Sequence, residues 1–592
     1  MADDAATFPH ADAVLSRSAK WTLHSTGSGR LDQKMRIRVL NYAGVKRYSE
    51  IQVPFHPAWD HTPVITGTVT SPDGKNVRQL SASEINIMDQ PWAAQAPRYP
   101  AGKILTANLP GVQPGSVIEY TLTRHLKDRP FISMKHAFAA HEPLLQDGLE
   151  VQFPAGHTPL TMPRPANTEC KGNHFTRRNV PAIPREPGQP DLTSFVPAWG
   201  FSCGNWHHLA TMLKTELTMR TNGQPSAETK GRALCAGLAK EAEKILAIRN
   251  FVLQNIRLTG PAYTELPLKY LTGADRVLAD GYGNSADRAI LLKTMLNAAG
   301  IPADFVAVSN IPYTGKRLNE LQNLPDAGVM QTILVAAGSD TQKYYLGGGN
   351  EYDILGTSPF ENHIALNLQT GQLFELTVQH PERDLMARFD IVLHENGTAD
   401  ITWTRRYYGA SFGEAAKMFA ELTPEKRRRY EQNLLAEISL NAVQKRSMLT
   451  QFDRYPGIRQ LEMTIPGFAV RTGPFRQFEL PEFKKLYHLF QTAGSRRKTP
   501  LERKAGSQLF LEYRIIFPPG WTPIATEDLQ ADSLNEQLIL RRRINGNVLQ
   551  ITASLEQRPC ESLITDHDYL EYLHGALGEQ SFQTVVFSVL QK

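Results

Sequence analysis

The chain has 592 residues, of which 41% are hydrophobic and 21% are charged, as in an ordinary soluble globular protein. Because this length is too great for one hydrophobic core, it predicts three or four domains. The net charge of +5 and the isolated basic runs at 426–429 and 541–543 argue against a nucleic-acid-binding protein. No apolar run approaches the about 20 residues of a transmembrane helix, so we expect no membrane span.

Cysteine and histidine usage gives no sign of a metal or cofactor site. The four cysteines form no CxxC pair and are widely spaced, at Cys170, Cys203, Cys235 and Cys560. Cys170 and Cys203 could pair in an oxidising compartment, although we favour buried free thiols. Since His207 and His208 are adjacent, they cannot place both rings on one helix face, and we interpret them as surface residues.

The N-terminal sequence leaves the cellular compartment open. Residues Met1-Ala-Asp-Asp lack the basic and apolar regions of a signal peptide. We therefore expect either a cytosolic protein or a periplasmic or secreted one from which a signal peptide has been removed.

The first part of the chain is expected to be a β-sandwich. Alternating apolar and polar residues predict half-buried strands at 21–24, 35–40 and 117–123. Turn sequences separate them at 41–44, 71–74 and 110–115. Short strands with such turns favour an antiparallel sandwich.

Three segments of this region resemble the DUF3857 domain. They are Arg38-Val-Leu-Asn41, Thr68-Val-Thr-Ser-Pro-Asp-Gly74-Lys and Leu109-Pro-Gly-Val-Gln-Pro-Gly-Ser-Val-Ile-Glu119-Tyr120. In many bacterial extracytoplasmic proteins that β domain precedes a transglutaminase-like core. The resemblance implies a β domain over 10–190, whose proline-rich end leads into an interdomain connection.

A helical region follows, with a predicted helix at 236–256 and a second one after a glycine-rich approach at 280–283. Asn284 or Ser285 is a suitable N-cap, and Asp287 suits the first turn of a helix. Gly300 and Pro302 end this helix, and a strand is predicted at 303–308.

This stretch resembles the nucleophile segment of the transglutaminase-like superfamily, whose pattern is Gly-x-Cys-x-Asp-x-Ala followed by Ala-Gly-Ile-Pro-Ala. Gly283, Asp287, Ala289 and the run 299–303 match, whereas Ser285 stands at the cysteine position. In the superfamily, the helix N-terminus would lower the pKa of that thiol. The resemblance implies a papain-like α+β core over 195–370.

The other two members of the superfamily's Cys-His-Asp triad are also replaced. The histidine position falls on Gln331 or Thr332, in a strand predicted at 330–335, and the aspartate position falls on Gly347, in a strand predicted at 344–349. A serine hydroxyl is a poor nucleophile without a base, and none of these residues can act as one near neutral pH. We therefore predict a catalytically inactive core with no catalytic residues.

One rearranged site keeps the alternative of an active enzyme open. A changed loop could bring His363 to Ser285, with Asp353 orienting the imidazole, because triads are defined by geometry and not by order. His363, however, leads into a strand predicted beyond the core, so we favour inactivity over a serine-dependent acyl transferase or hydrolase.

The region 372–592 is predicted to be β-rich, with a helical insert over 409–450 that begins its second helix at Thr423-Pro424. It resembles the C-terminal part of DUF3857 proteins. The whole chain is thus expected to be a multidomain α+β protein. We expect it to bind or scaffold a protein, peptide or glycan partner, with an envelope association implied by resemblance. A purely structural module of an envelope assembly is a third hypothesis.

Overall fold

The computed structural model describes residues 8, 10–339, 342–488, 497–503, 506–524, 527–532, 535–562 and 567–589. The chain forms two compact units. The first comprises 1–185, 190–347 and 363–376, and the second comprises 186–189, 348–362 and 377–592. Most of the predicted β domain and of the predicted core belongs to the first unit, whereas residues 186–189 and 348–362 belong to the second. The domain limits 10–190, 195–370 and 372–592 stay predictions.

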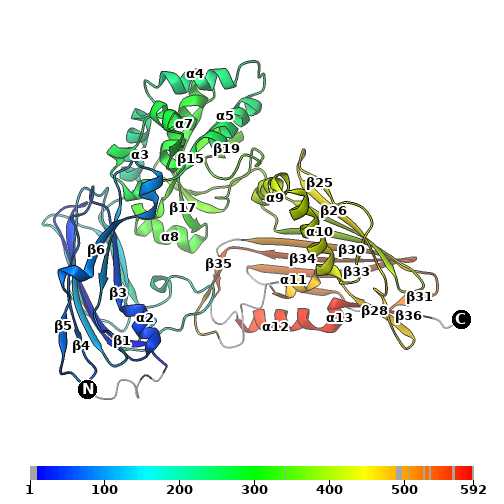
Figure 1. The fold of residues 1–592 in the computed structure, drawn as a ribbon, viewed down its shortest axis with the longest axis horizontal. Helices are drawn as coiled ribbons and strands as arrows, with labels where there is room; N and C mark the ends of the chain where they lie inside the picture. The colour runs from blue at the N-terminus through cyan, green and yellow to red at the C-terminus, as the bar shows by residue number, and fades with distance from the viewer. Residues whose placement is uncertain are drawn as a thin grey trace. The chain divides into compact units, whose positions relative to one another are not determined.

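The β domain is built on an eight-stranded sheet, drawn in blue and cyan in Figure 1. Its order is β12 (Glu169–Lys171), β13 (His174–Val180), β10 (Leu144–Gln152), β1 (Ala13–Leu23), β2 (Gly29–Val39), β8 (Val117–Leu126), β4 (Val64–Thr70) and β5 (Val77–Gln79). Neighbouring strands are antiparallel, except that β1 and β10 are parallel.

A smaller sheet packs on this one and makes the sandwich. It consists of β3 (Glu50–Phe55), β7 (Lys103–Asn108) and β6 (Ile85–Asp89). Val53, Phe55 and Leu105 of this sheet are buried in one cluster with Ile65 and Leu122 of the large sheet. A further sheet joins β11 (Leu160–Thr161), β14 (Ala198–Ser202) and β9 (Ser133–Ala137). The predicted N-terminal sandwich is confirmed.

The turn predicted at 41–44 is wrong, because these residues begin helix α2 (Tyr42–Tyr48). The side chain of Asn41 accepts a hydrogen bond from the amide of Gly44 at 3.0 Å. Asparagine favours both turns and helix N-caps, which explains why the sequence signal was ambiguous.

The core places helices around a buried helix and a sheet. The helices are α3 (Trp206–Met219), α4 (Pro225–Leu234), α5 (Glu241–Asn255), α6 (Ala274–Asp280), α7 (Ser285–Ala298) and α8 (Gly315–Asn323). The antiparallel sheet has the order β19 (Gln342–Leu346), β18 (Thr332–Ser339), β17 (Ala303–Pro312), β20 (His363–Asn367) and β21 (Leu373–Glu375). In Figure 1, α7 lies beside α4 and α5.

Several predicted limits in the core shift for identifiable backbone reasons. The helix predicted at 236–256 starts at Glu241, since Gly237 has φ +79° and cannot continue a right-handed helix. The strand predicted at 330–335 starts at Thr332, after a short 3-10 turn at Ala327–Val329. The strand predicted at 344–349 ends at Leu346, because Gly347 has φ +119°.

The second unit is β-rich with a helical insert, as predicted. Its main sheet contains β24 (Val443–Gln444), β26 (Gly457–Ile465), β23 (Ala399–Tyr407), β22 (Leu385–Leu393), β30 (Ser507–Ile516), β34 (Val548–Gln557), β33 (Glu536–Asn545) and β32 (Leu529–Asp532), and β25 (Leu449–Gln451) pairs with β26. The insert consists of α9 (Gly409–Glu421) and α10 (Pro424–Ile438), and Thr423 caps α10 as predicted.

Smaller elements complete the second unit. They are β27 (Val470–Thr472), β28 (Phe475–Glu479), α11 (Phe483–His488), β29 (Leu501–Arg503), β31 (Trp521–Pro523), β35 (Cys560–Ser562), α12 (His567–Gly578), α13 (Gln580–Gln583) and β36 (Thr584–Val589). The rings of Trp403, Phe389 and Tyr513 stack in succession in the buried core of this unit. Helices α11 and α12 were not predicted.

Candidate functional site

The candidate site lies at the start of α7, where Ser285 is the first helical residue. Asn284 is the N-cap, and its side chain accepts a hydrogen bond from the amide of Asp287 at 3.0 Å. Ser285 is half-buried, whereas the ten residues 286–292 and 294–296 are all buried. A helix that is buried on every side is held by its surroundings, so the position of Ser285 is fixed.

Ser285 and Gly347 both lie next to Ile333, a residue of β18. The amide of Ile333 donates a hydrogen bond of 3.4 Å to Oγ of Ser285. A Cβ atom added to Gly347 would lie 3.5 Å from the carbonyl oxygen of Ile333. Among the described residues, Ser285 Oγ has no other hydrogen-bond partner.

Neither residue predicted for the histidine position supplies a base. The side-chain oxygen of Gln331 accepts a hydrogen bond from Asn310 Nδ2 at 2.8 Å, at the exposed surface. Thr332 pairs with Val308 of β17 and is half-buried. An amide and a hydroxyl do not accept a proton near neutral pH. Within the described ranges, the backbone amide of Ile333 is thus the one hydrogen-bond partner of the Ser285 oxygen.

The backbone conformation at position 347 favours a glycine over an aspartate. Its φ of +119° lies in a region that L-amino acids with side chains rarely adopt. An aspartate at this position would need a different backbone, or it would carry strain.

The alternative residues His363 and Asp353 fall in different units. His363 opens β20, which pairs with β17 and belongs to the core sheet, so the prediction that this strand lies beyond the core is wrong. In the sheet order, β17 separates β20 from β18, whose Ile333 contacts Ser285. Asp353 belongs to the second unit, where its carboxylate accepts a hydrogen bond from the amide of Asn350 at 2.8 Å. The Ser285–His363–Asp353 site stays a prediction.

Two residues of the β domain support the N-terminus of α7. The hydroxyl of Tyr99 donates to Asp287 Oδ2 at 2.6 Å and accepts from the amide of Asn284 at 2.7 Å. Arg98 donates to the same carboxylate oxygen at 3.0 Å and to Asp280 at 2.6 Å. The segment that carries them follows the short helix Pro91–Gln95.

Asp287 acts in this network as a structural acceptor. Its other oxygen accepts from the amide of Thr272 at 2.8 Å, and the residue is completely buried. Burial raises the pKa of Asp287, while the hydrogen bonds from Tyr99 and Thr272 and the charge of Arg98 oppose that rise. Burial and the neighbouring carboxylate also raise the pKa of the Tyr99 phenol, which therefore stays protonated and donates.

Sequence analysis did not identify Arg98 and Tyr99 because they lie about 190 residues before the helix that they contact. Their sequence context, a run of aromatic and proline residues around Trp92, indicates a packed loop and nothing about its partner. Tyr99 packs edge-on against Trp92 and Tyr282.

Arg288 stands one turn after Ser285 and differs from every other arginine of the site. Its side chain is 5% exposed, and in the described part of the chain its guanidinium forms neither a hydrogen bond nor an ion pair. Burial alone lowers the pKa of Arg288 to about 10. A buried and unpaired charge is costly, so this residue calls for an explanation.

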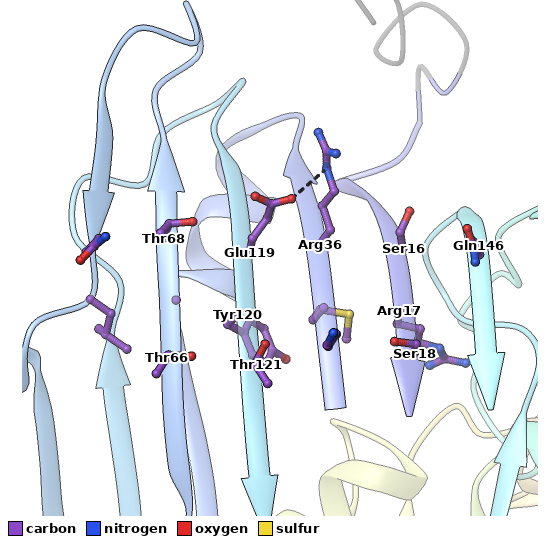
Figure 2. Close-up of a pocket in the computed structure, with 15 residues that line it drawn as sticks. Ser16, Arg17, Ser18, Arg36, Thr66, Thr68, Glu119, Tyr120, Thr121 and Gln146 are labelled. Atoms are coloured by element: carbon purple, nitrogen blue, oxygen red, sulfur yellow. Dashed lines mark ion pairs between the residues drawn. The ribbon is translucent and has the colours of Figure 1, made fainter. Parts of the chain in front are cut away.

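A second candidate surface is a hollow of about 660 Å³ on the eight-stranded sheet (Figure 2). One row across five neighbouring strands is in register and polar: Thr68, Glu119, Arg36, Ser16 and Gln146. Figure 2 shows these side chains on the same side of the sheet, with Arg36 and Glu119 paired at 3.7 Å. Such a surface offers many hydrogen-bonding groups and no proton-transfer machinery.

The described residues contain no cluster of three side chains suited to a metal ion. His207 and His208 are exposed on α3, as predicted. All four cysteines are free, and burial raises the pKa of Cys203 to about 11, so this thiol is a poor nucleophile. No helix within the described ranges is both long and apolar enough to cross a membrane.

Comparison with known protein families identifies two parts of the chain. Residues 25–184 match DUF3857, a domain of unknown function with a solved structure, and residues 229–318 match the transglutaminase-like superfamily. The chain therefore contains a DUF3857 domain and a transglutaminase-like region. Both resemblances inferred from the sequence are thereby confirmed.

Among solved structures, a "putative protease" from Parabacteroides distasonis ATCC 8503 has the same fold along the whole chain. Its TM-score is 0.63 at 16% identity, and the match covers 98% of this chain and 99% of that one. A "putative cysteine protease" from Cytophaga hutchinsonii matches with a TM-score of 0.18 at 10% identity, over 59% of this chain and 81% of that one, which is too weak to support an argument. No curated protein matches the sequence.

Proposed function

We propose that this DUF3857 protein is a catalytically inactive member of the transglutaminase-like superfamily that binds a protein, peptide or glycan partner. The observation that carries the proposal is the environment of Ser285. Its oxygen accepts from the amide of Ile333, and the neighbouring triad positions hold Thr332 and Gly347 in place of a base and a carboxylate.

The chemistry of acyl transfer explains why this environment favours inactivity. A serine needs a neighbouring base to remove its proton, and an orienting carboxylate then fixes that base. In subtilisin, loss of the catalytic histidine alone lowers turnover on the order of a million-fold. With all three groups replaced, no acyl-enzyme is expected at a useful rate.

The scaffold around Ser285 nevertheless remains well supported, which favours a retained binding role. The carboxylate of Asp287 accepts hydrogen bonds from Tyr99 and Arg98. The amide of Asn284 donates to the Tyr99 hydroxyl, and the amide of Asp287 donates to the side chain of Asn284. Burial of so many polar groups is stable only when they are paired, as they are here. A bacterial envelope location follows from the resemblance to DUF3857 proteins and belongs to the same proposal.

The proposal is tested by comparing the wild-type chain with Ser285→Ala. Release of peptides from labelled casein and incorporation of a labelled primary amine into casein measure hydrolysis and acyl transfer. We expect the two proteins to be equal and at background in both assays. A wild-type rate that exceeds that of Ser285→Ala would overturn the proposal.

The competing function is a serine-dependent acyl transferase or hydrolase that uses Ser285, His363 and Asp353. The placement of His363 at the start of a core strand favours it. This function requires that His363→Ala lower turnover as strongly as Ser285→Ala does. Equal background rates for both variants and the wild type would leave the binding function as the one supported.

A further inference from the structure

The unpaired guanidinium of Arg288 is the feature of the core that the proposed function leaves unexplained. Its Nε atom is buried without a hydrogen-bond partner, and no carboxylate among the described residues forms an ion pair with its side chain. Burial is the sole cause of its lowered pKa, so no negative charge of the described residues compensates it. Buried charges in proteins are normally paired, which leads us to seek the partner of Arg288 in a ligand.

The position of Arg288 on α7 places its side chain on the same side of the helix as Ser285. Residues three apart on a helix are neighbours on its surface, so Arg288 and Ser285 share one side of the first turn. Long side chains in helices lean toward the N-terminus, which carries the guanidinium toward that turn. Ser285 itself is half-buried, so the surface reaches this end of the helix.

The helix terminus adds a second attraction for a negative group. The first N–H groups of a helix lack partners inside it, and they give the N-terminus a partial positive charge. Asn284 caps only the amide of Asp287 in this turn. Arg288 and the terminus therefore act on an anion in the same direction.

The carboxylate of Asp287, the residue before Arg288, is already hydrogen-bonded to other residues. Asp287 accepts from Tyr99, Arg98 and Thr272, and these contacts hold it away from Arg288. Arg98 shows the contrast, since it is paired with Asp280 and with Asp287. Arg98 and Arg288 both lie near the start of α7, but among the described residues only Arg288 has its fork of donors available for an external acceptor.

We propose that Arg288 and the first turn of α7 bind a carboxylate group of a peptide partner. The planar guanidinium fork matches a carboxylate in two parallel hydrogen bonds, which a single ammonium group cannot reproduce. The proposal rests on the proposed function, because it assigns a ligand chemistry to the site at Ser285. Either the C-terminus of the peptide or an acidic side chain supplies the same group.

Binding is measured directly with acetate as the probe, by saturation-transfer NMR on its methyl group. Acetamide is the neutral control, and sodium chloride keeps the ionic strength equal. We expect a saturable acetate signal for the wild type, loss of that signal in Arg288→Met, and its retention in Arg232→Met. Arg232 lies on α4 with a side chain 55% exposed, so this control removes the same charge from the surface.

A second variant, Arg288→Lys, allows the proposal to be tested even if Arg288→Met does not fold. Arg288→Lys keeps the charge and loses the fork, and we expect it to weaken acetate binding at least fivefold. Equal acetate signals in the wild type and in both Arg288 variants would overturn the proposal, as would the absence of a saturable signal in the wild type.

Two short peptides then distinguish the source of the carboxylate. Acetyl-trialanine with a free C-terminus tests the chain end, and acetyl-Ala-Glu-Ala amide tests an acidic side chain. Whichever source is used should compete with acetate in the wild type, and the fully neutral acetyl-trialanine amide should not. Failure of both acidic peptides to compete would refute the peptide part of the proposal.

These outcomes are separate from those of the proposed function. Acetate binding at Arg288 needs no reaction at Ser285, so it can succeed even if casein turnover shows an active serine. Conversely, an inactive Ser285 together with absent acetate binding would leave the proposed function standing and remove the carboxylate site.

Discussion

The hydroxyl of Tyr99 in the β domain donates a 2.6 Å hydrogen bond to Asp287 in the transglutaminase-like core. This contact joins positions 188 residues apart and lies beneath the first turn of the helix that carries Ser285. The β domain is therefore part of the support of the site and not a separate attachment to it.

Replacing Tyr99 with phenylalanine should destabilise the protein by about 1–3 kcal/mol, because it removes one donor from the buried carboxylate of Asp287 and leaves the amide of Asn284 without its hydrogen-bond acceptor. Urea unfolding followed by fluorescence measures the change. Tyr42→Phe is the control, since Tyr42 is 67% exposed. A difference between the two variants of less than about 0.5 kcal/mol would contradict this role of Tyr99.

Gly347→Asp introduces an aspartate at the position that the superfamily resemblance assigns to one, and it should cost about 1–3 kcal/mol because φ is +119° at this position. Gly315→Asp is the matched control. Gly315 is the first residue of α8, with nothing within 4 Å of an added Cβ, and aspartate is favourable in a first turn. If Gly347→Asp is as stable as the wild type, the backbone argument against a carboxylate there fails.

The variant Ser285→Cys introduces a thiol whose pKa responds to the charge of Arg288. The helix terminus and Arg288 should lower the pKa of the new thiol by about one unit from its ordinary value near 8.5. Adding Arg288→Met should return most of that shift. The pH dependence of the alkylation rate with iodoacetamide gives both values, and identical profiles for the single and double variants would place the guanidinium away from residue 285.

Asp147 should give the β domain an acid-sensitive contribution to its stability. Burial alone would raise the pKa of Asp147, but hydrogen bonds and charges from His136 and Arg17 lower it below the ordinary 3.8. An acid with a lowered pKa in the folded state stabilises the fold above its unfolded pKa. The contribution is therefore lost as the pH falls from about 4 toward the folded pKa.

Unfolding midpoints in urea between pH 2.5 and 6 test this dependence on the wild type and Asp147→Asn. The variant should lose less stability than the wild type below about pH 4. Asp89→Asn is the control, because its side chain is 55% exposed. Parallel profiles for the wild type and Asp147→Asn would be inconsistent with a lowered pKa.

Much of the fold could be predicted because the decisive signals were local. The cap at Asn284, the buried stripe of α7 and the positive φ of Gly300 are features of a single continuous stretch. Alternation of apolar and polar residues likewise identified β2 and β8. Where one residue type serves two structures, as Asn41 does, the sequence could not decide between a turn and a helix.

The site was predicted only in part, because its support depends on contacts between distant segments. The superfamily pattern located Ser285, and the structure places the amide of Ile333 3.4 Å from its oxygen and Gly347 next to the carbonyl of Ile333. The contribution of Arg98 and Tyr99 required the packing of one domain on another. That Arg288 lacks a partner could not be predicted at all, since burial without a partner is a property of the folded surroundings.

The central claim is that Ser285 is not a nucleophile, and a fluorophosphonate tests it most directly. The folded wild-type chain is incubated with the reagent, and the peptide that contains Ser285 is analysed by mass spectrometry beside the same peptide of the denatured protein. The account predicts no phosphonylated Ser285 in either sample. A stoichiometric adduct that forms only in the folded protein would show an activated serine and contradict the account.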